Sequence, residues 1–579
     1  MSKLNIIVIL LCSMIPNPAY SSDIYLNQMG YLPGMKKVAV YGFSDTKRAS
    51  MFKGTNKLYI VDILSGKKVQ ELNCNSWEDG KRDTMSGDYV YHIDFSSFDE
   101  LGHYKIVDYV NKVESKSFKI TKGNNYKNIL KDALKTFYYQ RCGIEKTGHF
   151  SDASCHSKDL TCWPLLGEQP TRDLHGGWHD AGDYNKYVCY VYPGIQKLLS
   201  MYATAPDFWK NFTLEIPESN NDLSDLLDEI KWEMDWLLKM QNEDGSFLHL
   251  LGVDVSSGKY WSTYVGCPAS EDKEIRRYEG KSGQATGAAF SMVAASSYYF
   301  ANEKTGETSS KKYLKASLKA WDWIQNNPGK LKSAPKNARF LGSSNGFLGF
   351  YGKQKTAILE GLVFIHLQVP KAITMESVLK HYNAMKKSEF ISVLLWQYTH
   401  LAKADKKIRG AIQLAYKNAF EYDINSNAYG DPFSSTTWWG NNGNICARAY
   451  QVSLVKGLFD QAKQNHSQYF ISGALSYIHG TNPLGTAYLT NLSKYGVTQS
   501  LSKFYHGDSN LASDPPPAFI VGGPNFGFTG KSRAIKGRAP QKAFDLSFQA
   551  KPVYEYLEGQ VALQASYCAL LFSCILEAQ

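Results

Sequence analysis

Two different patterns of hydrophobic residues divide the chain. From Ile24 to about Thr121, short segments alternate apolar with polar residues and are separated by glycine or aspartate. A period of two, rich in β-branched and aromatic side chains, predicts strands. The series of such strands predicts an Ig-like all-β sandwich. These segments hold no convergent set of ionisable side chains that would form a site. Their sequences are KVAVYGF, KLYIVDIL, GDYVYHIDF, GHYKIVDYV and KSFKI.

From about residue 125 the hydrophobic period becomes that of a helix. Apolar residues recur at i, i+3, i+4 and i+7, which predicts a large helical domain. The loops between these segments hold clusters of Gly, Pro, Trp and Asn, and binding residues are commonly found on loops held by rigid elements. The predicted helices include 224–241, 283–300, 311–327, 389–404 and 559–577.

The N-terminus has the pattern of a secretory signal peptide. Lys3 precedes an apolar segment over 6–15, followed by a proline and small residues. We expect cleavage after Ser21 or Ser22 and export to the periplasm or the external medium. Cys12 follows Leu11 rather than a small residue, so no lipid anchor is expected. No later apolar run approaches the ~18–20 residues needed to span a bilayer, so no membrane association is expected after cleavage.

Composition narrows the class of protein. The 579 residues are 43% hydrophobic and 20% charged, which indicates a globular protein. Aromatic residues reach 13%, enough to fill a core or to line a cleft where rings stack on sugars or bases. The net charge is +10, but the lysines and arginines are dispersed, so nucleic-acid binding is not expected.

The segment HGGWHDAGDYNKYV, residues 175–188, is the best candidate for catalytic chemistry. It places Asp180 and Asp183 three residues apart among small and aromatic residues. Two neighbouring carboxylates suit hydrolysis, because one can take a proton from water while the other orients that water. In isolation, the same residues would also fit a turn followed by a helix N-cap.

This segment resembles the signature of glycoside hydrolase family 9, a family of inverting β-glucanases. Further segments resemble the family in the same order: WLLKMQNEDGSF (236–247), STTWWGNNGNICARAYQ (435–451), YIHGTNPLGTAYLTNLSKYG (477–496), PPPAFIVGGPN (515–525) and a final helix with Glu558. The resemblance covers most of the chain and implies an (α/α)6 barrel. We therefore expect a signal peptide at 1–22, the Ig-like sandwich at 23–121 and the catalytic barrel at 125–579.

The resemblance also implies roles for three carboxyl groups. Asp183 would be the general base, Asp180 would help to hold the nucleophilic water, and Glu558 would be the general acid. An inverting glycosidase needs a protonated acid at the leaving oxygen and an ionised carboxylate across the sugar. By itself, Glu558 would pass for an ordinary acidic residue near a helix N-terminus.

The candidates for substrate contact are less sharply defined. Many relatives carry a P-H-H-R segment that contacts the sugar, whereas this chain has KFYHGDSN at 503–510. His506 matches one histidine, or is a surface histidine, and the arginine is missing. Trp438, Trp439 and Trp178 are candidates for stacking on a pyranose, and burial in the core is an equally ordinary role for them.

Cys142, Cys155, His156 and His179 form a second set of candidate residues. Cys2His2 is a complete tetrahedral zinc set, although the spacing is not that of a zinc finger. Family members with the same RCG…CH…GWHDAGD arrangement bind a structural zinc there, so the resemblance implies one here. Calcium occurs in some relatives, but the chain has no D-x-D-x-D-G loop and a calcium site stays open.

These observations favour a secreted, monomeric endo-β-1,4-glucanase that acts on cellulose or mixed-linkage glucans. The nearest alternative is an exo-acting relative: a cellodextrinase, cellobiohydrolase or exo-β-glucosaminidase. A carbohydrate-binding protein without activity is the alternative from another class. The sequence does not distinguish an open cleft from a blocked one.

Overall fold

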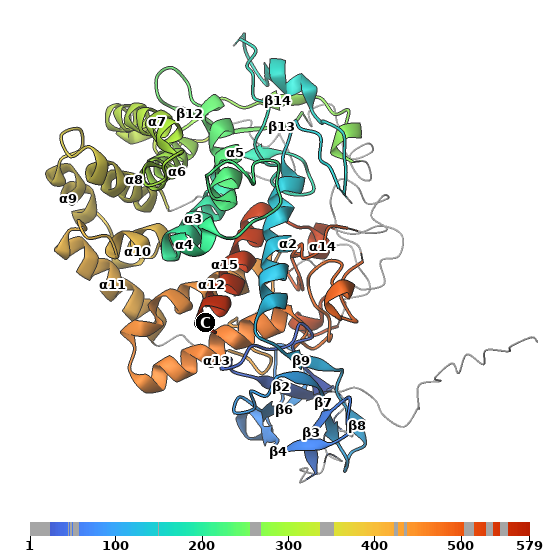
Figure 1. The fold of residues 1–579 in the computed structure, drawn as a ribbon. Helices are drawn as coiled ribbons and strands as arrows, with labels where there is room; N and C mark the ends of the chain where they lie inside the picture. Colours follow the sequence, from blue (N-terminus) through green and yellow to red (C-terminus); the bar gives the residue numbers. More distant parts are fainter. Residues whose placement is uncertain are drawn as a thin grey trace, which may run out of the picture.

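The computed structural model shows a small β unit beside a large helical unit (Figure 1). The predicted signal peptide and His506 lie outside the described residues. No helix within the described part is long and apolar enough to cross a membrane. The structure describes residues 24–44, 46, 49, 52, 57–148, 150–168, 170–254, 268–335, 353–421, 426–433, 437–502, 515–527, 537–544 and 554–578.

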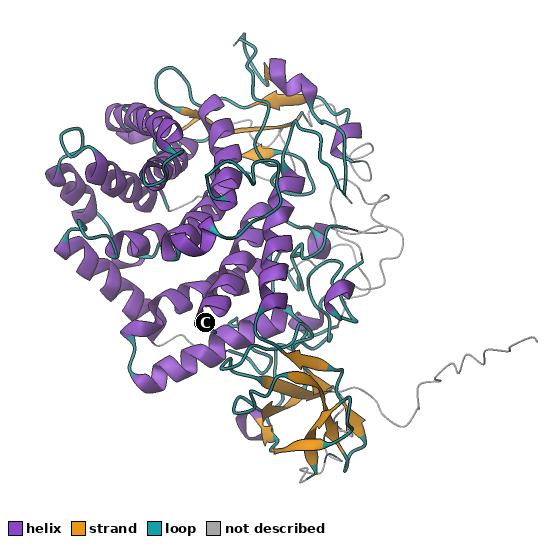
Figure 2. Ribbon diagram, viewed as in Figure 1, coloured by secondary structure: helices purple, strands orange, loops and turns teal. Residues whose placement is uncertain are grey.

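The β unit is a sandwich of two sheets, as predicted (Figure 2). The first sheet has the order β1-β2-β6-β5, and the second has the order β4-β3-β7-β8 with β9 also paired to β7. The antiparallel pair β2 and β6 runs in register from Val38 opposite Asp94 to Phe43 opposite Tyr89. The strands of the two sheets are β1 Ile24–Tyr25, β2 Val38–Phe43, β3 Leu58–Asp62, β4 Lys68–Leu72, β5 Asn75–Ser76, β6 Tyr89–Asp94, β7 Gly102–Asp108, β8 Val113–Glu114 and β9 Phe118–Ile120.

The helical unit alternates outer and inner helices along the chain, the arrangement of the predicted (α/α)6 barrel. The outer helices are α2 Asn124–Gln140, α5 Asp225–Lys239, α7 Glu307–Asn326, α9 Met375–Asn383, α11 Lys406–Glu421 and α13 Gln461–Ile478. The inner helices are α3 Val188–Thr204, α6 Gly283–Ala301, α8 Gln354–Gln368, α10 Val393–Thr399, α12 Asn441–Val455 and α15 Val561–Glu577. The first and last inner helices, α3 and α15, pack on each other and close the ring.

Shorter elements connect these helices. Two are helices, α4 Pro206–Lys210 and α14 Tyr554–Leu557. The others are strands in two small sheets: β10 Trp163–Pro164, β11 Lys186–Tyr187, β13 Leu250–Val253 and β14 Arg276–Tyr278 in one, β12 Phe247–Leu248 and β15 Lys281–Ser282 in the other.

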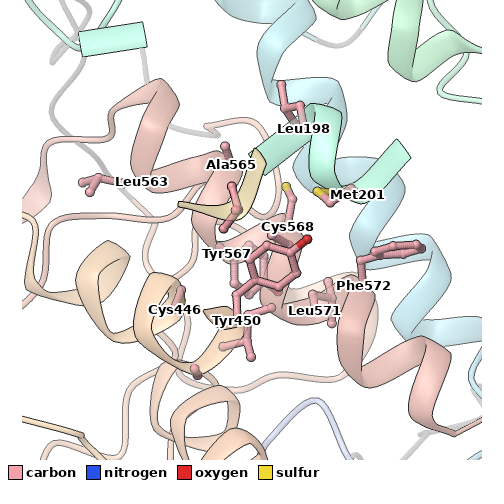
Figure 3. Packing of buried hydrophobic residues seen from close by; sticks show 14 of the residues in the cluster. Leu198, Met201, Cys446, Tyr450, Leu563, Ala565, Tyr567, Cys568, Leu571 and Phe572 are labelled. Atoms are coloured by element: carbon pink, nitrogen blue, oxygen red, sulfur yellow. The ribbon is translucent and has the colours of Figure 1, made fainter. Parts of the chain in front are cut away.

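The helix boundaries follow from local chemistry. Helix α5 begins after Ser224, whose hydroxyl accepts a hydrogen bond from the Leu227 amide. Asp225 and Asp228 lie in its first turn, near the positive end of the helix dipole, and Lys239 lies in its last turn, near the negative end. Both placements stabilise the helix. Helix α15 is apolar on nearly every side and is buried along almost its whole length. Figure 3 shows its side chains packed with those of α3 and α12.

One predicted helix is wrong in extent. The pattern over 389–404 predicts a single helix, whereas the structure has a short 3-10 turn, Lys387–Phe390, and then only α10. Ile391 is extended, and the Ser392 side chain accepts from the Leu395 amide as the N-cap of α10. A serine in this position starts a new helix because its oxygen satisfies an amide that has no intrahelical partner.

The sandwich and the barrel share polar contacts as well as apolar core. Asp88, at the turn before β6, accepts a hydrogen bond from Tyr429 (2.8 Å) and pairs with Lys542. At another point, Tyr126 of α2 donates to the Gly30 carbonyl (2.8 Å). The sandwich is therefore packed against the barrel.

Candidate active site

A cavity of about 720 Å³ opens at the end of the barrel where the inner helices begin. The N-terminal ends of α10, α12 and α15 border it, together with the first turns of α3. Asp180, Asp183 and Glu558 all face this cavity. The structure thus brings together the three predicted carboxyl groups from opposite ends of the chain.

Asp180 is fixed on a short strand pairing that joins these two chain ends. Its carbonyl accepts from the Val561 amide (2.9 Å), and Ala181 pairs with Gln560 as an antiparallel bridge. The Gln560 side-chain amide donates to Asp180 Oδ1 (3.0 Å), across 380 residues of sequence. This contact leaves the second oxygen of Asp180 for a water molecule.

Asp183 is held by hydrogen bonds from two residues that follow it. Tyr187 Oη and Asn185 Nδ2 each donate to Oδ2 at 2.8 Å, and the Asn185 amide donates to Oδ1 at 3.2 Å. Asp183 is not a helix N-cap, because α3 begins only after Tyr187. The donors stabilise the ionised carboxylate and fix its direction.

Glu558 lies between α14 and α15 and is almost completely buried. The indole N–H of Trp439 donates to its Oε2 (3.0 Å). Gly522 donates its amide to the Glu558 carbonyl (2.9 Å), which holds the backbone in place. The carboxyl group therefore projects into the cavity from a fixed position.

Burial raises the pKa values of Asp180, Asp183 and Glu558 above those of ordinary carboxyl groups, and repulsion adds to the rise at Asp180 and Glu558. Burial, followed by the charge of Asp183, raises the pKa of Glu558 well above its usual range. Burial also raises the pKa of Asp183, but the donors Tyr187 and Asn185 act against the rise. The pKa of Asp180 is raised well above its usual range by burial and then by Asp183. Asp183 therefore ionises most readily, while Asp180 and Glu558 are both favoured in the protonated form.

The four predicted metal-ligating residues also come together. Cys142, Cys155, His156 and His179 are buried, and one ligand atom of each lies within 4.8 Å of the others. Cys142 Sγ is 3.7 Å from His156 Nδ1, Cys155 Sγ is 3.7 Å from His179 Nε2, and the two histidine nitrogens are 3.3 Å apart. Tetrahedral bonds of about 2.3 Å to sulfur and about 2.0–2.1 Å to nitrogen would separate such pairs by about 3.5 and 3.4 Å. The cluster thus fits a tetrahedral metal.

Groups around the cluster suit a bound cation and its thiolates. The His156 ring nitrogen Nε2 is 3.2 Å from Asp272 Oδ2, and such carboxylates orient a histidine ligand. Lys186 Nζ lies 3.5 Å from Cys142 Sγ, where it favours the thiolate. Within the described residues no second group of three or more His, Cys, Asp or Glu side chains is close enough to hold a metal.

The comparison with known families decides the identity. The model described as glycosyl hydrolase family 9 matches residues 126–558, and that of the cellulase N-terminal Ig-like domain matches residues 19–112. The chain belongs to glycosyl hydrolase family 9. The predicted family resemblance is thereby confirmed.

The relatives within family 9 have low sequence identity to this chain, but their alignments cover most of it. Endoglucanase D of Acetivibrio thermocellus is 26% identical over 536 residues, covering 88% of this chain and 78% of the relative. A cellodextrinase of Butyrivibrio fibrisolvens is 27% identical over 565 residues, covering 90% and 94%. The crystal structure of a metagenome-derived family 9 endoglucanase shares the fold, with a TM-score of 0.80 at 24% identity over 96% of this chain and 98% of that one.

The three candidate tryptophans of this family 9 chain occupy different environments. Trp439 lines the cavity and keeps an exposed face, and Trp438 is 60% exposed beside it but does not line the cavity. Trp178 was a candidate either for stacking or for the core, and only 2% of it is exposed. Its indole N–H donates to Glu229 (2.8 Å), and its ring packs on Phe137 at 4.9 Å. Trp178 therefore belongs to the core and offers no face to a sugar.

Three residues of the site were not singled out from the sequence. Asn185 and Tyr187 lie within the 175–188 segment, two and four residues after Asp183, where a short strand returns their side chains to the carboxylate. Gln560 lies two residues after Glu558. Their polar character was the available signal, but hydrogen bonding to a particular oxygen depends on backbone geometry.

The contact between Trp439 and Glu558 leads to a test by pH profile. The indole N–H favours the ionised carboxylate, so Trp439→Phe raises the pKa of Glu558 further. Because the acid must be protonated, the basic limb of kcat/KM moves to higher pH. We also expect kcat to fall about tenfold as the carboxyl group loses its orienting contact. The control Trp438→Phe leaves the basic limb in place, and equal shifts in both variants would contradict this role.

Proposed function

We propose that this protein is a secreted, inverting β-1,4-glucanase that cleaves internal bonds. The observation that carries the proposal is the placement of Asp183 and Glu558 in one cavity with different hydrogen-bond environments. Asp183 takes a proton from water, Asp180 orients that water, and Glu558 donates a proton to the leaving oxygen. The predicted signal peptide and the family 9 relatives named endoglucanase support export and β-glucan cleavage.

An exo-acting cellodextrinase is the second candidate. A relative with that name matches 90% of this chain and 94% of its own length, at an identity close to that of endoglucanase D. Both activities use the same catalytic carboxyl groups, so the difference lies in how many sugar units bind on each side of them.

An exo-β-glucosaminidase is less well supported. Its substrate carries a free amine, which is positively charged and requires a carboxylate in the binding site. Apart from the catalytic Asp180, Asp183 and Glu558, the charged side chains that line the described cavity are two lysines. A neutral β-glucan fits this lining better than chitosan.

Zinc is the metal that best suits the Cys2His2 cluster. Two thiolates and two imidazoles form a closed tetrahedral set, which favours a structural role with no position open for substrate. His179 precedes Asp180, so the bound metal would hold the catalytic loop from its far side. When bound, it supplies stability and fixes the backbone, while the proton transfers belong to the carboxyl groups.

The product profile from cellohexaose tests the proposal. We expect early release of cellotriose, cellotetraose and cellobiose together, with new reducing ends first appearing as the α-anomer in NMR spectra. Inversion follows because water attacks the face opposite the leaving group. Release from the start of glucose with cellopentaose, or of cellobiose with cellotetraose and without cellotriose, would move the assignment to the exo-acting alternative. Products from chitosan hexamer but not from cellohexaose would contradict the glucanase proposal.

A further inference from the structure

Two lysines border the same cavity as the catalytic carboxyl groups. Lys197 lies in the third turn of α3, and Lys353 directly precedes α8. Lys197 is half-buried, whereas Lys353 keeps much of its side chain exposed. Both side chains line the same cavity, and the charge of Lys353 contributes to lowering the pKa of Lys197. They form a positively charged corner of a cavity that otherwise suits neutral sugars.

No carboxylate neutralises this corner directly within the described residues. Lys197 Nζ donates to the Pro193 carbonyl of its own helix (3.1 Å), and neither lysine forms an ion pair there. Glu360, the buried carboxylate nearby on α8, accepts instead from Tyr192 (2.8 Å) and Gln196 (2.7 Å). It also accepts from the hydroxyl groups of Ser291 and Ser392. Neutral donors thus occupy the Glu360 oxygens.

The pKa values of Lys197 and Lys353 are those of two neighbouring cations with no anion bound between them. Burial, and then the charge of Lys353, lowers the pKa of Lys197 to about 7. Partial loss of solvent around the ammonium group also lowers the pKa of Lys353, while Glu360 acts in the opposite direction. A carboxylate placed between the two ammonium groups would restore their charge and form charge-assisted hydrogen bonds. A sugar hydroxyl would relieve the repulsion far less, because it carries no charge.

Building on the proposed function, we propose that Lys197 and Lys353 form a subsite for the carboxylate of a hexuronic acid unit in a β-1,4-linked glycan. Apart from the three catalytic carboxyl groups, the other polar side chains on the wall of the cavity are uncharged and suit sugar hydroxyls. They include Gln196, Ser392, Asn444, Gln451 and Gln560. The lysine corner thus selects one acidic unit within a chain of otherwise neutral sugars. The chain's net charge of +10 also draws acidic polysaccharides toward it.

The test uses two substrates that differ only in charge. Cello-oligosaccharides in which some units are oxidised at C6 to glucuronic acid are compared with the same material after reduction of the carboxyl groups. For the unaltered protein we expect kcat/KM about tenfold higher on the oxidised material at low salt, with the preference falling as salt is added. The double variant K197M/K353M loses this preference and keeps its activity on the reduced material within about twofold.

Controls separate charge from folding and from the proposed function. Lys355→Met removes a lysine two residues away that bonds to the Ala384 carbonyl, and it keeps the preference. Lys353→Met alone lowers the preference partly, and Lys353→Arg retains it. Equal losses of the double variant on both substrates, or no preference in the unaltered protein, would overturn the subsite. Failure to hydrolyse the reduced material or cellohexaose would instead overturn the proposed glucanase activity.

Discussion

Glu558→Gln and Asp183→Asn each lower kcat on cellohexaose by about 10³-fold or more, since each removes a proton transfer that the reaction requires. The glutamine side chain has no acidic proton to give to the leaving oxygen, and the asparagine side chain cannot accept one from water. Both replacements preserve size, and both keep an oxygen for the donors Trp439 and Tyr187. The measurement is the initial rate of product formation, compared with the melting temperature of each variant.

The stability of these variants distinguishes a catalytic role from a structural one. Asp180, Asp183 and Glu558 are buried together, and the charge of Asp183 raises the pKa of both other groups through repulsion. Replacing one carboxyl group by an amide relieves that repulsion, so the melting temperature stays equal or rises. As the control, Glu577→Gln at the far end of α15 removes an ion pair with Lys456 and leaves the rate unchanged. A rate near that of the unaltered protein in either active-site variant would contradict the assignment.

Removal of the metal has the second large effect, and the effect is on stability. Cys142→Ser removes one ligand of the Cys2His2 cluster and leaves a buried, incomplete site. Because binding of a structural metal adds directly to the folding free energy, we expect the melting temperature to fall by at least about 5 °C. Metal content measured by mass spectrometry falls from one zinc per chain to none. Activity at temperatures well below the transition is reduced less than about tenfold.

A nearby cysteine provides the matched control for this experiment. Cys162 is also buried, but it lies outside the cluster, where its thiol is 3.7 Å from the Trp163 carbonyl. Cys162→Ser therefore keeps the zinc. Complete removal of metal without a change in melting temperature would contradict the structural role. Immediate loss of activity at an unchanged melting temperature would indicate a metal that takes part in the reaction.

The sequence pattern predicted the architecture well because burial imposes a regular period. The alternation in residues 24–121 predicted the sandwich, and the helical period predicted segments that coincide closely with α5, α6, α7 and α15. The failure over 389–404 arose because the apolar residues there continue through Ser392, while the serine side chain starts a new helix. A hydrophobic period does not show which polar residue satisfies a backbone amide.

The site was predicted unevenly for related reasons. No spacing or periodicity connects Asp183 with Glu558, so their proximity was predicted from the family resemblance alone. Cys142 and His179 were likewise brought together by the fold rather than by a short motif. Both stacking and burial were open for Trp178, because the sequence does not show which face of an indole is covered. The sequence does not mark Lys197 as a site residue, because a single lysine among apolar residues is commonly solvated.

The bridge between Ala181 and Gln560 makes the catalytic centre a late product of folding. The base is carried by the first inner helix region and the acid by the last, so no fragment that lacks α15 and the residues just before it can contain both. Contacts between such distant segments form slowly, because the intervening chain must first lose much of its freedom. Recovery of hydrolysis during refolding would therefore report closure of the whole ring, after helical circular dichroism has already returned.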